Sequence, residues 1–519
     1  MSKQNTARLA FHVFADYGMI IVLLLLCVCF SAATYERQNP TGVTAAEQLF
    51  GKIRSAVPES PKVAIFVPNT TEGQEFRDFL VEKLEGSGGT VLASVIGEPA
   101  EMRATLESFS DAAEKPDVIA CDSSILAFSF IRDLKTRFPQ LSESEVMTAN
   151  AFSWPTFLTA ANLRAISNRI AVIAIIAIAM TMVIITAGID LSVGSLIAFS
   201  AVVATWLIRA SAEENVTLNV PYQWYVAWHC SLGLVLLILG LVRLRSRRAV
   251  SGGLQIVASL GLPYLATGIA WLGIFLLITM GQNAASMTVC CLTAILLSAG
   301  IGAFNGWMVT SFRVPPFIVT LAMFLIARSL AKIIANNETI YQIPNSFGWL
   351  GKGLLFGVPY TLILMLLLYL VAHIVMTKTV FGRYVYAVGG NPEAARLSGV
   401  PVNRVVLTCY IICGAMAGIG GIITASELAK GKATYGEMAE LQVIAAVVVG
   451  GTSLAGGRGK ILGTLIGALI IGVISNGMNL VNIESNTQGV VLGFVILGAV
   501  LLDQAKDKIW AKITQTPLE

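Results

Sequence analysis

Apolar runs recur along this chain, and several are long enough to cross a lipid bilayer as helices. A helix needs roughly 20 predominantly apolar residues to span the hydrocarbon core. The 519 residues are 55% apolar and only 13% charged, with a mean hydropathy of +0.74. A soluble protein of this size rarely combines such values, because its surface must carry charge. The sequence therefore predicts an all-α polytopic membrane protein.

We expect about twelve transmembrane helices, counted from the apolar runs and the polar residues between them. The first run, residues 17–33, has the length and small residues of a signal peptide, but we interpret it as an uncleaved membrane helix. The other runs are residues 165–186, 196–208 with the residues just before, 224–242, 254–280, 284–309, 317–335, 360–376, 405–425, 441–451, 462–480 and 488–502.

A hydrophilic segment, residues 38–151, interrupts the apolar pattern after the first helix. Strands are expected at 62–67, 90–96 and 117–121, and helices at 72–85, 99–113 and 124–138. This alternation predicts a small parallel α/β layer. The stretches KVAIFVPNTTEGQEFRDFL and KPDVIACDSS resemble one lobe of a type I periplasmic sugar-binding protein. A single lobe lacks the second half of a ligand cleft, so a cap or docking surface is favoured over an independent sugar site.

Charge assigns the predicted loops to the two sides of the membrane. Basic residues gather at 243–248, 313, 378–404, 458–460 and in the C-terminal tail, whereas the opposite loops carry Glu213, Glu214, Glu338, Glu437, Glu440 and Glu484. The positive-inside rule then places the N-terminus in the cytoplasm and the insert outside, in the periplasm of a Gram-negative cell. The arginines at 243–248 follow an apolar run, so we interpret them as a topology signal and expect no nucleic-acid partner.

The longest charged break in the apolar C-terminal half, residues 378–404, contains a short predicted helix. Asn391 is a good N-cap and Pro392 fits the first helical position. Glu393 then lies in the first turn and Gly399 provides a stop. A helix of about two turns is unstable alone in water, so we expect a partner protein to hold it.

Four stretches resemble the ribose/galactose/xylose-type ABC importer permeases, over roughly residues 150–505. They are ITAGIDLSVGSLIAFSA from Ile185, FNGWMVTSFRVPPFIVTLAM from Phe304, FGRYVYAVGGNPEAARLSGV from Phe381 and LQVIAAVVVGGTSLAGGRGKILGTLIGALIIGVISNGMNL from Leu441. The resemblance implies a membrane subunit that dimerises, pairs with a cytoplasmic ABC ATPase and receives sugar from a periplasmic binding protein. Two segments are additional to the family pattern, the α/β insert and a two-helix hairpin at 224–280.

The predicted organisation has four parts. Residues 1–37 form the tail and first helix, 38–151 the exported insert, 152–505 the permease domain with its added hairpin, and 506–519 a cytoplasmic tail. The multi-pass chain is expected in the bacterial inner membrane. We expect contact with the ATPase through Gly389, Gly390, Asn391, Pro392, Glu393, Ala394, Ala395, Arg396 and Gly399.

ATP and magnesium are assigned to the partner ATPase, and no cofactor or metal is expected in this chain. The run Gly456-Gly457-Arg458-Gly459-Lys460 is not a phosphate-binding loop. Leu454 stands where that motif needs glycine, and Ile461 replaces its serine or threonine. The sequence contains no catalytic triad, paired carboxylates or metal-ligand cluster, so we do not expect an enzyme.

The transport pathway has five candidate residues: Asp190, Ser192, Asn305, Thr452 and Ser453. Polar breaks in apolar helices are tolerated where they line a cavity or the protein interior. Asp190 has two possible roles, contact with sugar hydroxyls or a gate, and capping of the following helix through Ser192 and Val193 N–H groups. The stretch 450–457 echoes 187–194, which indicates an internal repeat.

Two further features bear on packing. Arg328 falls inside an apolar run, where a charge is a functional candidate by default, and we expect an acidic partner. Glycine pairs at 302/306, 414/418 and 463/467 permit close helix contact, within the chain rather than between chains.

The function predicted from the sequence is the permease subunit of an ATP-driven importer for a ribose-like monosaccharide. Two alternatives stay open: a membrane-bound sugar sensor that uses the exported lobe, and an ion-coupled secondary transporter. The ion-coupled alternative needs buried acids beyond Asp190, and the apolar runs contain almost none.

Overall fold

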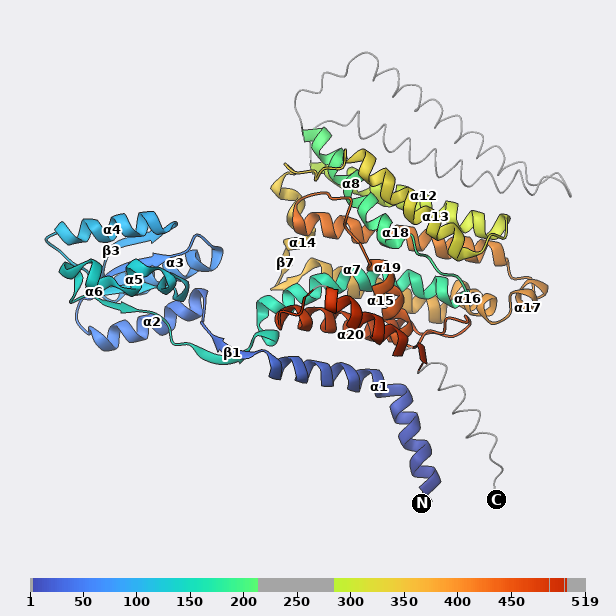
Figure 1. Cartoon of the computed structure of the whole chain (residues 1–519), viewed down its shortest axis with the longest axis horizontal. Helices are drawn as coiled ribbons and strands as arrows, with labels where there is room; N and C mark the ends of the chain where they lie inside the picture. Colours follow the sequence, from blue (N-terminus) through green and yellow to red (C-terminus); the bar gives the residue numbers. More distant parts are fainter. Residues whose placement is uncertain (1–2, 213–283, 485, 499, 502–519) are drawn as a thin grey trace, which may run out of the picture. The chain divides into compact units, whose positions relative to one another are not determined.

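A computed structural model describes residues 3–212, 284–484, 486–498 and 500–501. The chain divides into two compact units: Ser31–Thr159, and Met1–Phe30 together with Ala160–Glu519 (Figure 1). The predicted hairpin at 224–280 and the predicted tail at 506–519 lie outside the described residues.

The unit Ser31–Thr159 contains a four-stranded parallel sheet in the order β3–β2–β4–β5. The strands are β2 (Lys62–Val67), β3 (Thr90–Ile96), β4 (Val118–Cys121) and β5 (Glu145–Met147). The first three match the predicted strands, whereas the three-residue β5 is absent from the sequence prediction. The parallel α/β layer expected from the alternating pattern is therefore present.

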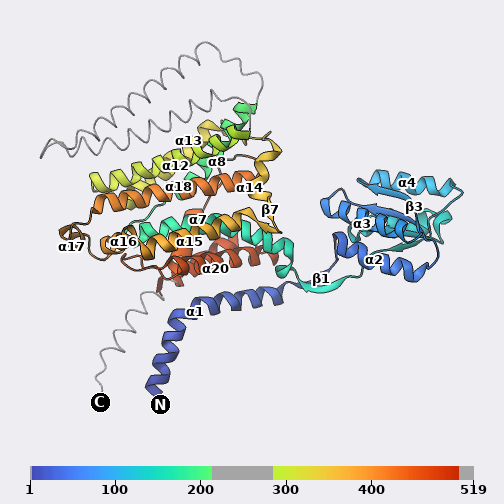
Figure 2. The same cartoon turned by 180° about the vertical axis from the view of Figure 1, so that it is seen from behind.

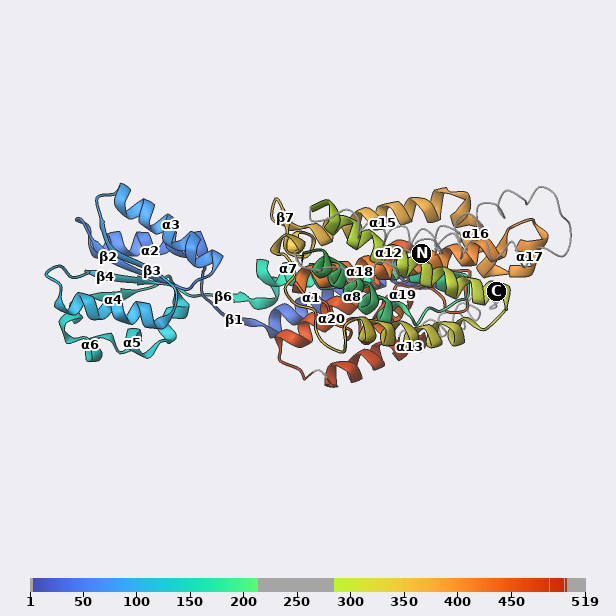
Figure 3. The same ribbon diagram turned by 90° about the horizontal axis from the view of Figure 1, so that it is seen from above.

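Helices cover both faces of this sheet (Figure 3). Val63, Ile65 and Val67 of β2 pack in the core under α2 (Gly42–Ala56) and α3 (Thr71–Gly86). The alternate residues Ala64 and Phe66 pack in a second core under α4 (Pro99–Asp111). Strand geometry explains this division, because successive side chains point to opposite faces.

The single helix predicted at 124–138 is wrong. The chain instead forms three short helices, η1 (Ser123–Ala127), α5 (Ser129–Arg132) and α6 (Leu134–Arg137). Asp122 accepts a hydrogen bond from the Ser124 N–H at 2.8 Å, which starts a tight turn in place of a regular helix. Phe128 then adopts an extended conformation at ψ 127° and interrupts the run.

An antiparallel ribbon holds the two ends of this unit together. Strand β1 (Tyr35–Gln38) pairs with β6 (Phe152–Pro155), with Tyr35 opposite Pro155. The Thr156 N–H also donates to the Thr34 carbonyl at 2.8 Å. The chain therefore enters and leaves the unit through adjacent strands.

Among the described residues, seven helices are long and apolar enough to cross a membrane. They are α7 (Ala160–Ile185), α8 (Val193–Ala212), α12 (Ala284–Ser311), α13 (Pro316–Ile334), α15 (Tyr360–Lys378), α18 (Val402–Leu428) and α20 (Ile461–Leu480). Shorter apolar helices occur at Gly18–Ala33, within α1 (Lys3–Ala33), at α19 (Ala439–Val449) and at Asn486–Gly498. The polytopic helical class is confirmed, and the number twelve stays a prediction.

Glycines allow neighbouring helices of this unit to pack with their backbones in contact. A Cβ added at Gly302 of α12 would overlap the Tyr410 carbonyl oxygen of α18, and one at Gly414 would overlap the Ser298 carbonyl oxygen. A Cβ added at Gly467 of α20 would likewise overlap a carbonyl of α19. The predicted use of these glycines within the chain is confirmed.

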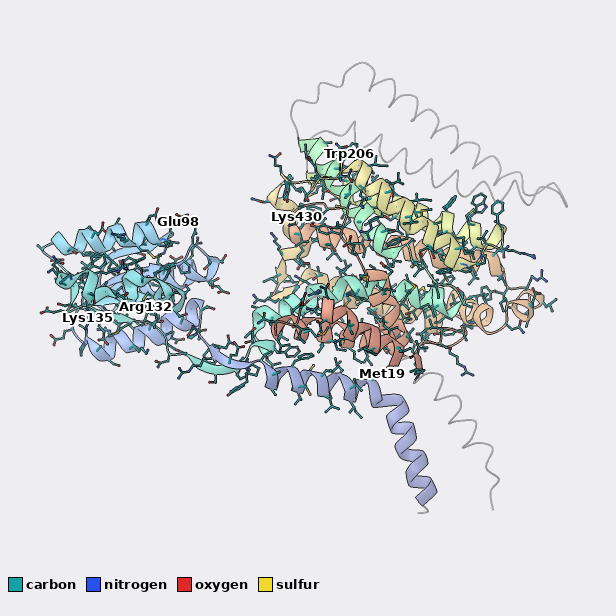
Figure 4. The ribbon with its side chains drawn as sticks, in the orientation of Figure 1. Met19, Glu98, Arg132, Lys135, Trp206 and Lys430 are labelled. Carbon is teal, nitrogen blue, oxygen red and sulfur yellow. The ribbon has the colours of Figure 1, made fainter. Side chains whose placement is uncertain are left out.

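The N-terminal helix belongs to the same unit. Met19 of α1 packs with Ile470 and Ile474 of α20 (Figure 4). At the two ends of the unit lie different short elements. Helices α16 (Val380–Gly390) and α17 (Pro392–Leu397) lie at one end, and α14 (Trp349–Lys352) and β7 (Leu354–Leu355) lie at the other (Figure 2).

Candidate functional site

The short helix α17 (Pro392–Leu397) has both its predicted ends. The Asn391 Oδ1 accepts a hydrogen bond from the Ala394 N–H at 3.0 Å, so Asn391 caps the helix. Gly399 follows the last turn at φ +84°, the left-handed conformation that favours glycine. These local bonds define a helix of six residues, shorter than the predicted two turns.

Most of α17 is exposed at the surface of the chain. Glu393 and Arg396 form an ion pair of 2.7 Å across one helical turn, and both side chains are largely solvent-accessible. Leu397 is 85% exposed, whereas Ala395 is buried against the rest of the unit. An exposed leucine beside exposed charges gives this helix an apolar contact point with a polar border.

Gly389 connects α16 to the interior of the helical unit. A Cβ at this position would overlap the Ile185 carbonyl oxygen at the end of α7 and would lie 2.7 Å from the Gly457 nitrogen. Gly390 has open space at the same position, with nothing within 4 Å of an added Cβ. Of these two predicted coupling residues, Gly389 packs its backbone directly against the rest of the unit and leaves no room for a side chain, whereas Gly390 has room for one.

Two helix connections meet beneath α16. Residues 186–192 join α7 to α8, and residues 450–460 join α19 to α20. The Gly457 N–H donates to the Ile185 carbonyl at 2.9 Å and so links the two connections. The end of α16 therefore contacts both breaks in the membrane helices at once.

The two connections begin with the same turn. Ala187 and Gly451 are both left-handed, at φ +61° and +83°. Their N–H groups, and those of Gly188 and Thr452 after them, all bond back to carbonyls of the preceding helix. The predicted repeat paired Ala187 with Gly450, whereas the left-handed conformations pair Ala187 with Gly451.

Tyr386 ties α16 to the second connection through its side chain. Its hydroxyl donates to the Gly459 carbonyl at 2.8 Å. Tyr386 was not among the predicted site residues, because nothing in the pattern marks which face of α16 meets a distant loop. The helix also carries Arg383 and a second tyrosine, Tyr384, so the Tyr386 hydroxyl did not stand out in the sequence.

Asp190, Ser192 and Asn305, three of the five pathway candidates, form one buried cluster. The Asp190 Oδ1 accepts from the Ser192 N–H at 2.9 Å and from the Ser192 hydroxyl at 2.6 Å. The Asn305 side-chain amide donates to the same hydroxyl at 3.1 Å. Burial raises the pKa of Asp190, while the bonds from Ser192 lower it. Asp190 thus caps α8 through Ser192.

The other two pathway candidates belong to residues 450–460. Thr452 is fully buried, and a Cβ added at Gly459 would lie 2.7 Å from its hydroxyl oxygen. The Ser453 N–H donates to the Arg458 carbonyl at 3.0 Å. These contacts place both residues in the packing of the second connection, apart from the bonds that hold Asp190.

Two substitutions of Asp190 distinguish its role as a hydrogen-bond acceptor at the start of α8 from the role of its negative charge. Asp190→Ala removes the acceptor of the Ser192 N–H, and we expect a loss of about 1–2 kcal/mol in unfolding free energy. Asp190→Asn keeps an acceptor oxygen and should retain most of the stability. Thermal unfolding of the purified permease in detergent measures both. Equal destabilisation by the two variants would show that the carboxylate charge is required.

Arg328 is 8% exposed within α13. Its Nη1 donates to the carbonyl oxygens of Ala433 and Tyr435, each at 2.7 Å. The expected acidic partner is not bonded to it among the described residues, although Glu437 and Glu440 lie within electrostatic range. Backbone carbonyls, which a sequence pattern does not reveal, are the hydrogen-bond partners of this buried cation.

Membrane-length helices interrupted by polar connections, with buried polar groups at the breaks, are those of a polytopic integral membrane protein. The chain belongs to the family described as "Branched-chain amino acid transport system / permease component", which matches residues 162–500.

Several curated relatives are named as ribose or L-arabinose permeases. The chain is 36% identical to the ribose import permease protein RbsC of Escherichia coli K12 over 356 residues, which cover 68% of this chain and 88% of the relative. It is 34% identical to RbsC of Bacillus subtilis 168, over 68% of this chain and 87% of the relative. The L-arabinose ABC transporter permease protein AraH of Azospirillum brasilense is 31% identical, over 67% and 82%. No solved structure matches significantly. The predicted resemblance is confirmed.

Proposed function

We propose that this chain is the permease subunit of an ATP-driven importer and forms the membrane pathway for a monosaccharide. One observation carries the proposal: the similarity covers 88% of a ribose import permease and 82% of an arabinose permease. Relatives named for two different pentoses, ribose and L-arabinose, support a monosaccharide as the transported class. The chain is thus a transport subunit, and ATP hydrolysis belongs to another polypeptide.

In this proposal a cytoplasmic ATPase binds ATP and magnesium and contacts the permease through α17. Exposure of Leu397, together with the Glu393–Arg396 ion pair, supplies an apolar contact with a polar border. Movement of α17 would reach both helix connections through Gly389, whose backbone packs on Ile185. Nucleotide-driven closure of the ATPase would then displace the two helix connections, the one that follows α7 and the one that precedes α20.

The remaining partners and the orientation belong to the same proposal, and the charge of the predicted loops supports the orientation. We propose an inner-membrane protein that crosses the bilayer about twelve times and acts as a dimer with a second copy. The end of the unit that carries α17 faces the cytoplasm, and the end with α14 and β7 faces the periplasm. The insert 38–151 then lies on the periplasmic side, where a sugar-binding protein delivers substrate.

Leu397→Asp tests the coupling role of α17. We expect at least a tenfold loss of ATP-dependent sugar uptake, because burying a carboxylate against the ATPase is unfavourable. Proteoliposomes that contain the permease, its ATPase and its binding protein would be assayed with radiolabelled D-ribose and L-arabinose. Glu393→Ala should uncouple ATP hydrolysis from uptake in the same assay.

Leu355→Asp is the matched control, since it introduces the same charge at an exposed leucine in β7, at the opposite end of the unit. It should retain uptake. Normal uptake by Leu397→Asp would contradict the coupling role. Uptake driven by an ion gradient without ATP would instead favour a secondary transporter, and sugar binding without uptake would favour a receptor.

A further inference from the structure

A short β-hairpin of apolar residues lies at the end of the helical unit away from α17 (Figure 2). Strand β7 pairs with β8 (Val358–Pro359), and Phe356 and Gly357 form the turn between them. All five residues at 354–358 are apolar, and all are exposed. An uninterrupted apolar run at a protein surface indicates contact with something other than water. The hairpin therefore calls for an apolar partner.

Phe356, the first residue of the turn, gives the clearest indication of such a partner. Its side chain is 98% exposed, and its backbone is left-handed at φ +50°. Gly357 follows at φ +81°, so both turn residues have the positive φ of a type I′ turn. Asparagine suits the first position of this turn, whereas a bulky side chain is strained there. A phenylalanine that strains the backbone and adds little packing within the described chain points to a contact outside it.

The start of α15 sets the level of the hairpin in the membrane. Strand β8 ends at Pro359, and α15 begins at the next residue, Tyr360. With 19 residues, α15 is about 28 Å long, close to the hydrocarbon thickness of about 30 Å. A strand of two residues extends only about 7 Å, which is roughly the depth of one headgroup layer. The turn therefore lies at the boundary between hydrocarbon and water.

The side chains around the hairpin favour lipid over protein as the partner. Trp349 of α14 is 60% exposed and packs edge-on against Tyr360, with ring centroids 6.1 Å apart. Tryptophan and tyrosine are enriched at the headgroup level of membrane proteins. A protein docking surface has a polar rim, but residues 353–359 carry no charged or hydrogen-bonding side chain. An apolar tip beside interfacial aromatic residues matches a lipid surface.

We propose that the β7–β8 hairpin inserts Phe356 among the lipid headgroups and upper acyl chains of the leaflet at this end of the unit. The inference goes beyond the proposed function, because it assigns a lipid-binding surface apart from the pathway and from α17. Trp349 and Tyr360 contact lipid at the same level. The contact fixes the depth of α15 in the bilayer and takes no part in ATP coupling, so Leu355→Asp stays a control for uptake.

Tryptophan fluorescence tests the lipid contact. Phe356→Trp places an indole at the turn, and Leu397→Trp is the matched control, because Leu397 is 85% exposed on α17. Each full-length variant would be placed, without the ATPase, in nanodiscs of phosphatidylglycerol and phosphatidylethanolamine, with ordinary or brominated acyl chains. The emission of the unsubstituted permease is subtracted. Brominated lipid should quench roughly half or more of the emission added at position 356, and aqueous iodide should quench mainly that added at 397.

Two results would overturn the proposal. One is emission at position 356 that iodide quenches as strongly as emission at 397, with no effect of brominated lipid. The other is protection of position 356 only after a periplasmic sugar-binding protein is added, which would make the hairpin a protein docking surface. Trp349→Phe provides an independent measurement with the native turn. The emission that it removes should be smaller in brominated than in ordinary lipid, and equal losses would contradict the lipid contact.

Discussion

Gly389→Ala is expected to destabilise the permease by about 3 kcal/mol or more and to reduce transport more than tenfold. The added methyl would overlap the Ile185 carbonyl oxygen and approach the Gly457 nitrogen, which are themselves joined by a hydrogen bond. Relief of the overlap requires α16 to move away from both helix connections. The change therefore disrupts the contact that links α17 to the breaks in the membrane helices.

Gly390→Ala is the stability control, because it adds the same methyl one residue later where nothing lies within 4 Å. Thermal unfolding and the yield of monodisperse protein in detergent compare the two variants directly. We expect a large drop for Gly389→Ala and little change for Gly390→Ala. Equal stability of the two variants would show that the close approach of α16 to Ile185 is not required for folding.

Arg328→Met should have the second large effect. The variant keeps an apolar side chain of similar length but leaves the carbonyls of Ala433 and Tyr435 without their donor. Each unpaired buried carbonyl costs about 1–3 kcal/mol, so we expect a loss of about 4 kcal/mol. The segment 429–438 should then lose its position against α13, and transport should fall below detection.

Limited proteolysis near Lys430, together with thermal unfolding, measures this change. Lys332→Met removes an exposed cation one turn further along α13 and should be neutral. Arg328→Lys can still donate to one or both carbonyls and should recover part of the stability. Wild-type stability of Arg328→Met would mean that these two bonds contribute nothing to the fold.

Features set by local chemistry could be predicted from the sequence. The apolar runs predicted the membrane helices, because the thickness of the bilayer fixes the length that such a helix needs. Asn391 and Gly399 gave both ends of α17, because a cap and a left-handed stop depend on neighbouring backbone groups only. The strands at Lys62–Val67 and Thr90–Ile96 were predicted with their observed bounds.

Features set by distant contacts could not be predicted. The acid expected beside Arg328 is replaced by two backbone carbonyls from a segment about a hundred residues away. No periodicity marks the contact of Gly389 with Ile185, which depends on how α16 folds back. The five predicted pathway residues do not form one cluster, again because distant contacts decide their positions. Thr452 packs within its own helix connection, whereas Asp190 accepts a hydrogen bond from Ser192.

The β1–β6 ribbon explains how one polypeptide carries a second compact unit, Ser31–Thr159, within its sequence. Because Tyr35 stands opposite Pro155, this unit occupies no more of the flanking backbone than an ordinary short turn would. The chain on either side of the unit is therefore held together at its point of entry and exit, and the unit needs no wider opening in the flanking sequence. The family match begins just beyond this ribbon, at residue 162.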